Sequence, residues 1–326
     1  MALGLGLFVV LGLVVLPVLV TMLAVALAQR LGGDDTAGWE SPGPTVRARR
    51  HELLIASASA MGAVVCAGVV LSLPVAGTGA LAVLPEVPGI AQALGPFAAV
   101  VVFCAVRAAG ELTWPRPSGI VRTAPLVRRT VRSLGGARLR WLLVTVLALA
   151  FALVVFGLVA GEGGRQFDHP PVIWPDGSVS ESSRGPFPGW PYGVPLLAGL
   201  VAAVLATVTT LRLIARRSPL AGVAGEHDAA VRATSAARLL GGVQLLVGGT
   251  LGMTLWTAGS ALRPGGELPA GAAGAWLPGV GVVLMVAGVV IGVASGICGL
   301  LTAMPSRPAN ASASAPAVRL DRGVRA

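Results

Sequence analysis

The sequence contains no lysine, so all 24 of its basic side chains are arginine. This absence excludes the phosphate-binding lysine of a P-loop, a Schiff-base lysine for pyridoxal phosphate or retinal, and a lysine general base. Charge is also scarce, because only 12% of the residues are charged, against roughly 25% in soluble proteins. With 55% hydrophobic residues and a mean hydropathy of +0.82, the chain is predicted to be an integral membrane protein.

Residues that carry chemistry are few. The cysteines, Cys66, Cys104 and Cys298, each lie inside an apolar stretch without a C-x-x-C spacing, which is typical of packing residues rather than of a disulfide or a metal site. The apolar stretches hold no Asp, Glu, His or Arg, and neither H-E-x-x-H nor a pair of intramembrane aspartates is present. We therefore expect no enzymatic activity, no cofactor and no metal. Arg107 and Glu111, four residues apart, are expected to form an interfacial ion pair.

Seven apolar runs are long enough, or nearly so, to cross the roughly 30 Å hydrocarbon core of a bilayer as helices. They cover residues 3–28, 53–73, 88–106, 141–161, 192–211, 239–260 and 276–303. We predict an all-α integral membrane fold with a seven-helix domain over residues 1–303 and a disordered cytoplasmic tail over residues 304–326. A cleaved signal peptide is the alternative for the first run, but that run has no basic residue before it and exceeds the usual length.

The arginines are distributed unevenly among the connections between these runs. Twenty-one of the 24 fall in segments 29–52, 107–140 and 212–238 and in the carboxyl-terminal tail. The positive-inside rule therefore predicts that the amino terminus lies outside a cell membrane and the carboxyl terminus in the cytoplasm. Anchoring to anionic headgroups on the cytoplasmic side explains the net charge of +10, so we expect no binding to nucleic acid.

The segment 107–140 is the most basic of the predicted cytoplasmic elements. Within it Val127, Val131 and Leu134 recur at helical spacing while the arginines point elsewhere, which predicts a short amphipathic helix on the inner leaflet. The residues expected to contact a protein partner or anionic lipid are Trp114, Arg116, Arg128, Arg129 and Arg132. The alternative is that these residues only anchor the topology.

Small and polar residues inside the runs suggest where helices meet. In the last run a packing seam is expected at Gly281, Gly288, Gly292 and Gly296, because glycines at this spacing leave one face open to another backbone. Such a seam joins helices of one chain or of two subunits, and we favour one chain. The residues expected to line a polar cavity, or to bond to a neighbouring helix, are Gln92, Thr207, Thr210, Gln244 and Thr254.

The stretch Gly-Glu-Leu-Thr-Trp-Pro-Arg-Pro at 110–117, followed by Arg-Thr-Ala-Pro-Leu at 122–126, resembles a segment of uncharacterised multi-spanning membrane proteins of high-GC Gram-positive bacteria. The resemblance covers under a tenth of the chain and implies no activity. We expect a non-catalytic accessory or regulatory membrane subunit whose arginine-rich inner face contacts a membrane or cytoplasmic protein. The alternative is a permease for a neutral or weakly polar solute, which a continuous polar cavity reaching the midplane would favour over a solid bundle.

Overall fold

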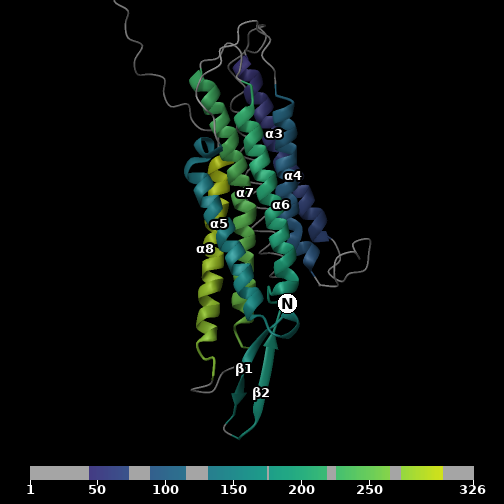
Figure 1. Cartoon of the computed structure of the whole chain (residues 1–326), viewed down its shortest axis with the longest axis vertical. Coiled ribbons are helices and arrows are strands. Elements are labelled where there is room, and N and C mark those ends of the chain that lie inside the picture. The colour runs from purple at the N-terminus through teal and green to yellow at the C-terminus, as the bar shows by residue number, and fades with distance from the viewer. Residues whose placement is uncertain are drawn as a thin grey trace, which may run out of the picture.

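The structure, a computed structural model, describes residues 44–72, 89–114, 131–174, 176–218, 225–264 and 273–303. Its long helices are α3 (Pro44–Ser72), α4 (Ile90–Leu112), α5 (Val131–Val159), α6 (Trp190–Arg216), α7 (Gly225–Ala261) and α8 (Leu277–Ala303). They form an elongated bundle (Figure 1). Among the described residues, all six are long and apolar enough to cross a membrane, and they correspond to the second to seventh predicted spans. The first predicted span and the tail lie outside the described residues.

The helices extend further than the predicted spans at the ends where charge is concentrated. Helix α7 begins at Gly225 rather than at residue 239, and α5 begins at Val131 rather than at residue 141. The prediction ended each span where ionisable residues began, because an unpaired charge is costly in hydrocarbon. On α7 these charges are paired, Arg238 with Glu52 of α3 and Arg232 with Asp228 of the same helix, whereas Arg138 and Arg140 on α5 are exposed.

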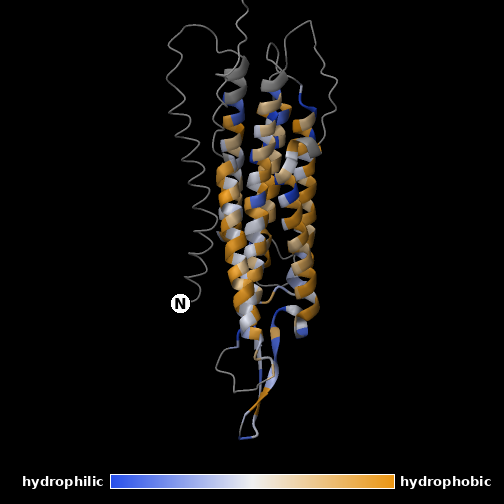
Figure 2. Ribbon diagram, turned by 90° about the vertical axis from the view of Figure 1, so that its left-hand side faces the viewer, coloured by the Kyte–Doolittle hydropathy of each residue, from blue (hydrophilic) through white to orange (hydrophobic). Residues whose placement is uncertain are grey.

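Helix α7 lies at the centre of the bundle and contacts all five other long helices. Buried side chains from α4, α5, α6 and α7 form one core that includes Phe97, Leu149, Leu211 and Leu240. The outward faces remain apolar, as the orange colouring of the helices indicates (Figure 2). Phe151 of α5, for example, is 71% exposed. Such exposure is stable in lipid and would be unfavourable in water, which agrees with a multi-pass membrane protein.

Helix α8 packs on α7 along a seam of glycines. A Cβ atom added to Gly288 would lie 2.5 Å from the carbonyl oxygen of Gly252, and one added to Gly252 would lie 2.6 Å from that of Gly288. Gly259 and Gly281, each seven residues from the first pair along its own helix, face each other in the same way. The backbones can approach this closely only because no side chain intervenes. The predicted seam is therefore an intramolecular contact at these positions.

The other two glycines of the predicted seam differ from each other. The backbone nitrogen of Gly292 lies 3.4 Å from the place that a Cβ on Gly252 would occupy, so Gly292 borders the seam. A Cβ on Gly296 would have nothing within 4 Å, so this glycine is not part of the contact. Ser295, its neighbour, occupies that level of the seam instead and faces Gly248.

The connection between α5 and α6 forms a β-hairpin. It contains the strands β1 (Phe167–Ile173) and β2 (Val179–Arg184), paired antiparallel around a turn in which the Gly177 amide donates to the Trp174 carbonyl. A guanidinium nitrogen of Arg184 donates to the carbonyl of Arg263 at 2.7 Å, which ties the hairpin to the connection after α7. Figure 1 shows the hairpin projecting beyond the helices.

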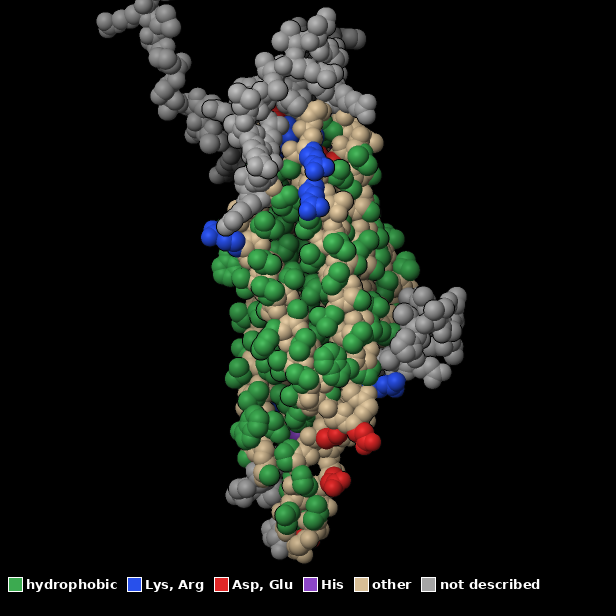
Figure 3. All heavy atoms as spheres, in the orientation of Figure 1, with side chains coloured by type: hydrophobic (Ala, Val, Ile, Leu, Met, Phe, Trp, Pro, Cys, Tyr) green, Lys and Arg blue, Asp and Glu red, His purple; other side chains and the backbone are tan. Residues whose placement is uncertain are grey.

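The two ends of the bundle differ in charge. We call the end from which β1 and β2 project the hairpin end. The opposite end, where α3, α5 and α7 begin and α4, α6 and α8 finish, is named the arginine-rich end. On the face shown in Figure 3 most basic side chains lie toward the arginine-rich end, and the most exposed acidic ones lie near the hairpin.

Replacing Gly288 by valine is expected to lower the free energy of unfolding by about 1–3 kcal/mol, because the added side chain meets backbone atoms that cannot turn aside. The measurement is the midpoint of thermal unfolding in mild detergent. The matched control is Gly296→Val on the same helix, where the new side chain meets open space. Equal losses in both variants would contradict the seam.

Candidate functional site

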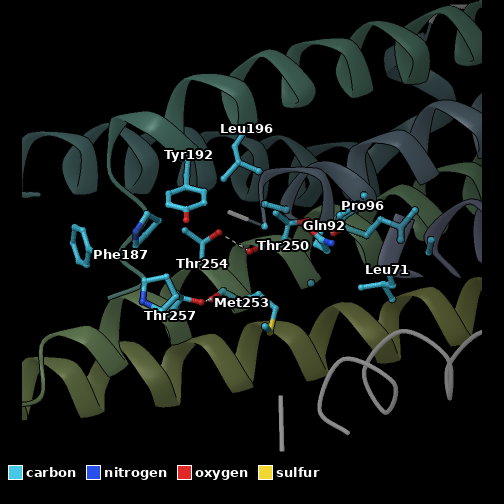
Figure 4. A pocket seen from close by; sticks show the side chains of 18 of the residues that line it. Leu71, Gln92, Pro96, Phe187, Tyr192, Leu196, Thr250, Met253, Thr254 and Thr257 are labelled. Carbon is cyan, nitrogen blue, oxygen red and sulfur yellow. Dashed lines mark hydrogen bonds between the residues drawn. The ribbon is translucent and has the colours of Figure 1, made fainter. Parts of the chain in front are cut away.

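A cavity of about 360 Å³ lies between α3, α4, α6 and α7, and residues 186–188 after the hairpin complete its described wall. Figure 4 shows Tyr192 of α6 and Thr254 of α7 facing each other across it. Cavities of this size, between helices and with mostly apolar walls, are typical of small-molecule sites.

The cavity is long and narrow, and it begins at the hairpin end. On α7 its wall extends from Thr257 to Leu245, a length of ~18 Å at 1.5 Å per helical residue. The apolar span of α7 covers Asp228–Ala261, so Leu245 lies near its middle. The cavity therefore reaches from the hairpin end to about the centre of the bundle.

The wall is uncharged and only partly polar. Among the described residues that line it there is no Asp, Glu, Arg or His. The polar side chains are Gln92, Tyr192, Thr250, Thr254 and Thr257. Each threonine hydroxyl donates a 2.8 Å hydrogen bond to the backbone carbonyl of its own helix one turn earlier, which leaves its oxygen able to accept. Such a wall suits a ligand without net charge, because an unpaired charge would be desolvated here.

Two of the five residues predicted for a polar cavity, Gln92 and Thr254, lie in this wall. Thr207 and Thr210 are instead buried between α6 and α4, where the Thr210 hydroxyl donates to the Cys104 carbonyl at 3.3 Å. Spacing alone could not separate a helix contact from a cavity wall, because both place polar groups on inward faces.

Gln244 lies neither in the cavity wall nor in the contact between α4 and α6, but between α5, α7 and α8. Its amide nitrogen donates to the hydroxyl of Thr145 on α5 at 2.9 Å and to that of Ser295 on α8 at 3.3 Å, so it joins three helices. Three polar residues of the cavity wall were missed by sequence reasoning, namely Tyr192, Thr250 and Thr257. The spacing of Thr250, Thr254 and Thr257 at i, i+4 and i+7 marks one helical face and could have revealed two of them.

A second constellation, the buried charge network, lies at the arginine-rich end. Glu52 of α3 accepts hydrogen bonds from Arg107 of α4 at 3.5 Å and from Arg238 of α7 at 3.4 Å. The Ser235 hydroxyl donates to the other carboxylate oxygen of Glu52 at 2.8 Å. All four side chains are buried, so each charge depends on its partners rather than on water.

The network continues to the ends of α4 and α6. Arg217 forms an ion pair with Glu111 at 3.4 Å, and its guanidinium lies 3.7 Å from the centre of the Trp114 ring. Burial lowers the pKa of Arg217, and the Glu111 carboxylate opposes that effect. His51 places its ring edge-on to Trp114 and bonds through Nε2 to the Gly110 carbonyl at 2.9 Å.

The last part of the network is on α7. Arg232 donates from Nε and Nη2 to Asp228 at 2.9 and 2.7 Å, and from Nη1 to the carbonyl of Arg217 at 2.6 Å. This arginine is only 2% exposed. It therefore fixes the end of α6 to α7 through a backbone oxygen.

One prediction about these residues was wrong. Arg107 and Glu111 do not pair with each other but with Glu52 and Arg217, because packed helices offer closer partners than one helical turn does. The predicted spans contain no ionisable residue as placed, and Glu52, Arg107 and Arg232 lie beyond their ends, within the longer helices α3, α4 and α7.

The predicted contact surface for a partner is mostly outside the described residues. Arg116, Arg128 and Arg129 fall there, and for Arg132 the structure describes the helical backbone but not the side chain. Trp114 is described and is 5% exposed, since it is covered by Arg217 and His51. It therefore stabilises the charge network and is not available to a partner.

The cavity and the charge network involve the same helices. Both draw on α3, α4, α6 and α7, and in the described ranges neither α5 nor α8 contributes to either. Between them Phe103 of α4 packs so closely on α7 that a Cβ on Gly242 would lie 2.5 Å from its ring. The Arg107 guanidinium lies 5.3 Å from the centre of that ring, so Phe103 contacts the network at a position on α4 between the cavity residue Pro96 and Arg107.

The described part of the chain holds no group of three or more His, Cys, Asp or Glu side chains that could bind a metal ion. Searches against protein-family models, curated proteins and solved structures give no match. The resemblance carried by residues 110–126 therefore stays a prediction, and function has to be argued from the cavity and the network themselves.

Replacing Glu52 by glutamine is expected to lower the free energy of unfolding by about 3–5 kcal/mol, because two buried arginines lose the carboxylate that they share. Glutamine keeps the shape of the side chain, so the loss measures charge. Thermal unfolding in detergent is the measurement, and Glu181→Gln on the exposed strand β2 is the control. A Glu52→Gln variant as stable as this control would contradict the network.

Proposed function

We propose that the protein is a non-catalytic permease that binds a neutral, weakly polar solute in the cavity. The observation that carries this proposal is an uncharged cavity of about 360 Å³ that reaches the centre of a membrane-spanning bundle. Its size falls within the range of small-molecule sites, and its few polar groups are enough to orient a ligand. The sequence criterion for a permease was a continuous polar cavity. The bundle is not solid, but the wall of its cavity is mostly apolar, so the proposal rests on the depth and lack of charge of the cavity.

The orientation follows from the positive-inside rule, which assigns the arginine-rich end to the cytoplasm. The hairpin end then faces the outside, and the cavity receives its solute from there or from the outer leaflet. The five described arginines at the other end that are exposed are Arg50, Arg138, Arg140, Arg212 and Arg216. Their positions suit the headgroups of anionic lipid on the cytoplasmic side.

Closure at the cytoplasmic end is the second requirement of a permease. Phe103 packs against Gly242 of α7, and the charge network joins the helices that line the cavity at the arginine-rich end. Ionisable groups buried in a membrane bundle are costly, and they commonly mark a transport path or a switch. We assign the network the role of a barrier that opens when the inner ends of these helices separate.

Cysteine labelling tests the permease. In a background without Cys66, Cys104 and Cys298, Thr254→Cys should react with a membrane-impermeant maleimide from the hairpin side, because Thr254 lines the cavity. It should also react from the arginine-rich side of inside-out vesicles, more slowly, because the network must open first. If Thr254→Cys is labelled from the hairpin side alone, the protein does not transport its solute and only the proposed binding function remains.

Three further variants control this experiment. Thr207→Cys, buried against α4, should stay unlabelled from both sides, which excludes general loosening of the bundle. Ser178→Cys in the hairpin turn should label from outside and Ser218→Cys, exposed after α6, from the cytoplasm. If Ser178→Cys is labelled from the cytoplasm and Ser218→Cys from outside, the proposed orientation is wrong, and the proposal about the cavity is unaffected.

A second candidate function, an accessory or regulatory subunit, is favoured by the exposed arginines of the arginine-rich end. A charged surface of this kind can bind acidic residues of a membrane or cytoplasmic protein as well as lipid. Affinity purification in mild detergent should then recover a stoichiometric second protein. The triple variant Arg138→Gln, Arg140→Gln and Arg212→Gln should reduce that recovery, whereas Arg165→Gln at the opposite end should not. Recovery of the chain alone would contradict the subunit hypothesis.

A further inference from the structure

The buried charge network holds more positive than negative charge. Its described ion pairs involve four arginines and three carboxylates, and every one of these side chains is at most 9% exposed: Arg107, Arg217, Arg232, Arg238, Glu52, Glu111 and Asp228. Among the described residues, one positive charge is therefore left without a carboxylate of its own. An excess charge that is removed from water is costly, so an anion bound at this place would be stabilising.

The donors without a partner are concentrated on Arg217. Its Nη1 bonds to Glu111, but its Nε and Nη2 are buried and have no acceptor in the described part of the chain. On Arg232 the same two nitrogens both donate to the Asp228 carboxylate. Arg107, by comparison, leaves only Nε without an acceptor. Arg217 thus presents, unused, the edge through which a guanidinium binds an oxyanion at two points.

Trp114 adds a third donor beside this edge. The Arg217 guanidinium lies 3.7 Å from the centre of the Trp114 ring, so the two groups are stacked. The indole Nε1 is also buried, with no acceptor among the residues that the structure describes. A carboxylate has two oxygens, which the arginine edge alone would occupy, whereas a phosphate has a further oxygen that can accept from the indole. Three donors at one place therefore fit a phosphate group best.

The pair lies directly beneath the surface of the arginine-rich end. Trp114 and Arg217 follow the ends of α4 and α6, and the residues before and after them in sequence, Thr113 and Ser218, are exposed. Arg216 is exposed as well, and its charge raises the positive potential around the pair. An anion that approaches this end of the bundle is thus attracted toward the unused donors.

We propose that Arg217 and Trp114 form a binding site for a phosphate group, which is held by Nε and Nη2 of Arg217 and by Nε1 of Trp114. The group belongs to the headgroup of an anionic lipid or to a dissolved phosphate, since both present the same oxygens to these donors. The site is separate from the cavity, so this proposal and the permease stand or fall independently.

Thermal unfolding of the full chain in a maltoside detergent, which contains no phosphate, tests the site. Inorganic phosphate and dihexanoylphosphatidylglycerol are titrated separately, with sodium chloride at matched ionic strength as the reference. At least one probe should raise the midpoint saturably, by roughly 5 °C at about 100 times its dissociation constant. A rise with the lipid alone identifies a headgroup site, and a rise with inorganic phosphate identifies a site for the dissolved ion. If neither probe raises the midpoint above the chloride reference, the proposal is wrong.

Two variants locate the site. Arg217→Lys keeps the charge but lacks the edge with two nitrogens, and Trp114→Phe keeps the ring but lacks the donor. Arg217→Lys should weaken binding of the active probe about 10- to 100-fold and Trp114→Phe about tenfold, because each lost hydrogen bond is made to a charged acceptor. Each dissociation constant is obtained from the shift relative to the same variant without probe, so a lower starting stability does not affect the comparison.

The matched controls are Arg216→Lys, at the exposed neighbouring position, and Trp256→Phe on α7, which is 36% exposed. Both should bind the probe as the unmodified chain does. Equal weakening in Arg216→Lys and Arg217→Lys would mean that the probe binds to the exposed arginines as a group, and it would overturn the site.

Discussion

The pairing of buried charge at the arginine-rich end is the constraint on which the rest of the structure depends. Glu52 is shared by two arginines from different helices, and a carboxylate in that position cannot be left alone in a medium that desolvates it. The angles and depths at which α3, α4 and α7 meet are therefore fixed at one end. The cavity lies between the same three helices and α6, nearer the hairpin end.

Helix α7 has a glycine-lined face toward α8 and a threonine-lined face toward the cavity. Toward α8 it has no side chains at Gly252 and Gly259, so the backbones touch and little can move. Toward the cavity it presents Thr250, Thr254 and Thr257, whose hydroxyls are held by their own helix. Helix α7, held closely against α8, thus forms one wall of the cavity.

The sequence reveals the membrane class and six helices of the described bundle, because long apolar runs are determined by hydrocarbon thickness alone. The helix ends were wrong because the cost of a charge depends on its partners, and partners such as Glu52 and Arg107 are 55 residues apart. The sequence could identify Gln92 and Thr254 as inward-facing polar residues, but not as parts of one cavity wall. Thr207 and Gln244 show the same local pattern, yet they lie in contacts between helices. Only the packing of the bundle decides whether an inward-facing residue contacts another helix or lines a cavity.

The chain's exclusive use of arginine has a structural counterpart at Arg232. Its guanidinium uses three nitrogens at once, two toward Asp228 and one toward the carbonyl of Arg217, and all of them lie in one plane. A lysine ammonium is a single point of charge and cannot span both acceptors in this geometry. A bias in codon usage can explain arginine on the surface, but at position 232 lysine cannot replace arginine. A lineage that drifted toward lysine elsewhere would have to keep arginine here, so this site would record the ancestral residue longest.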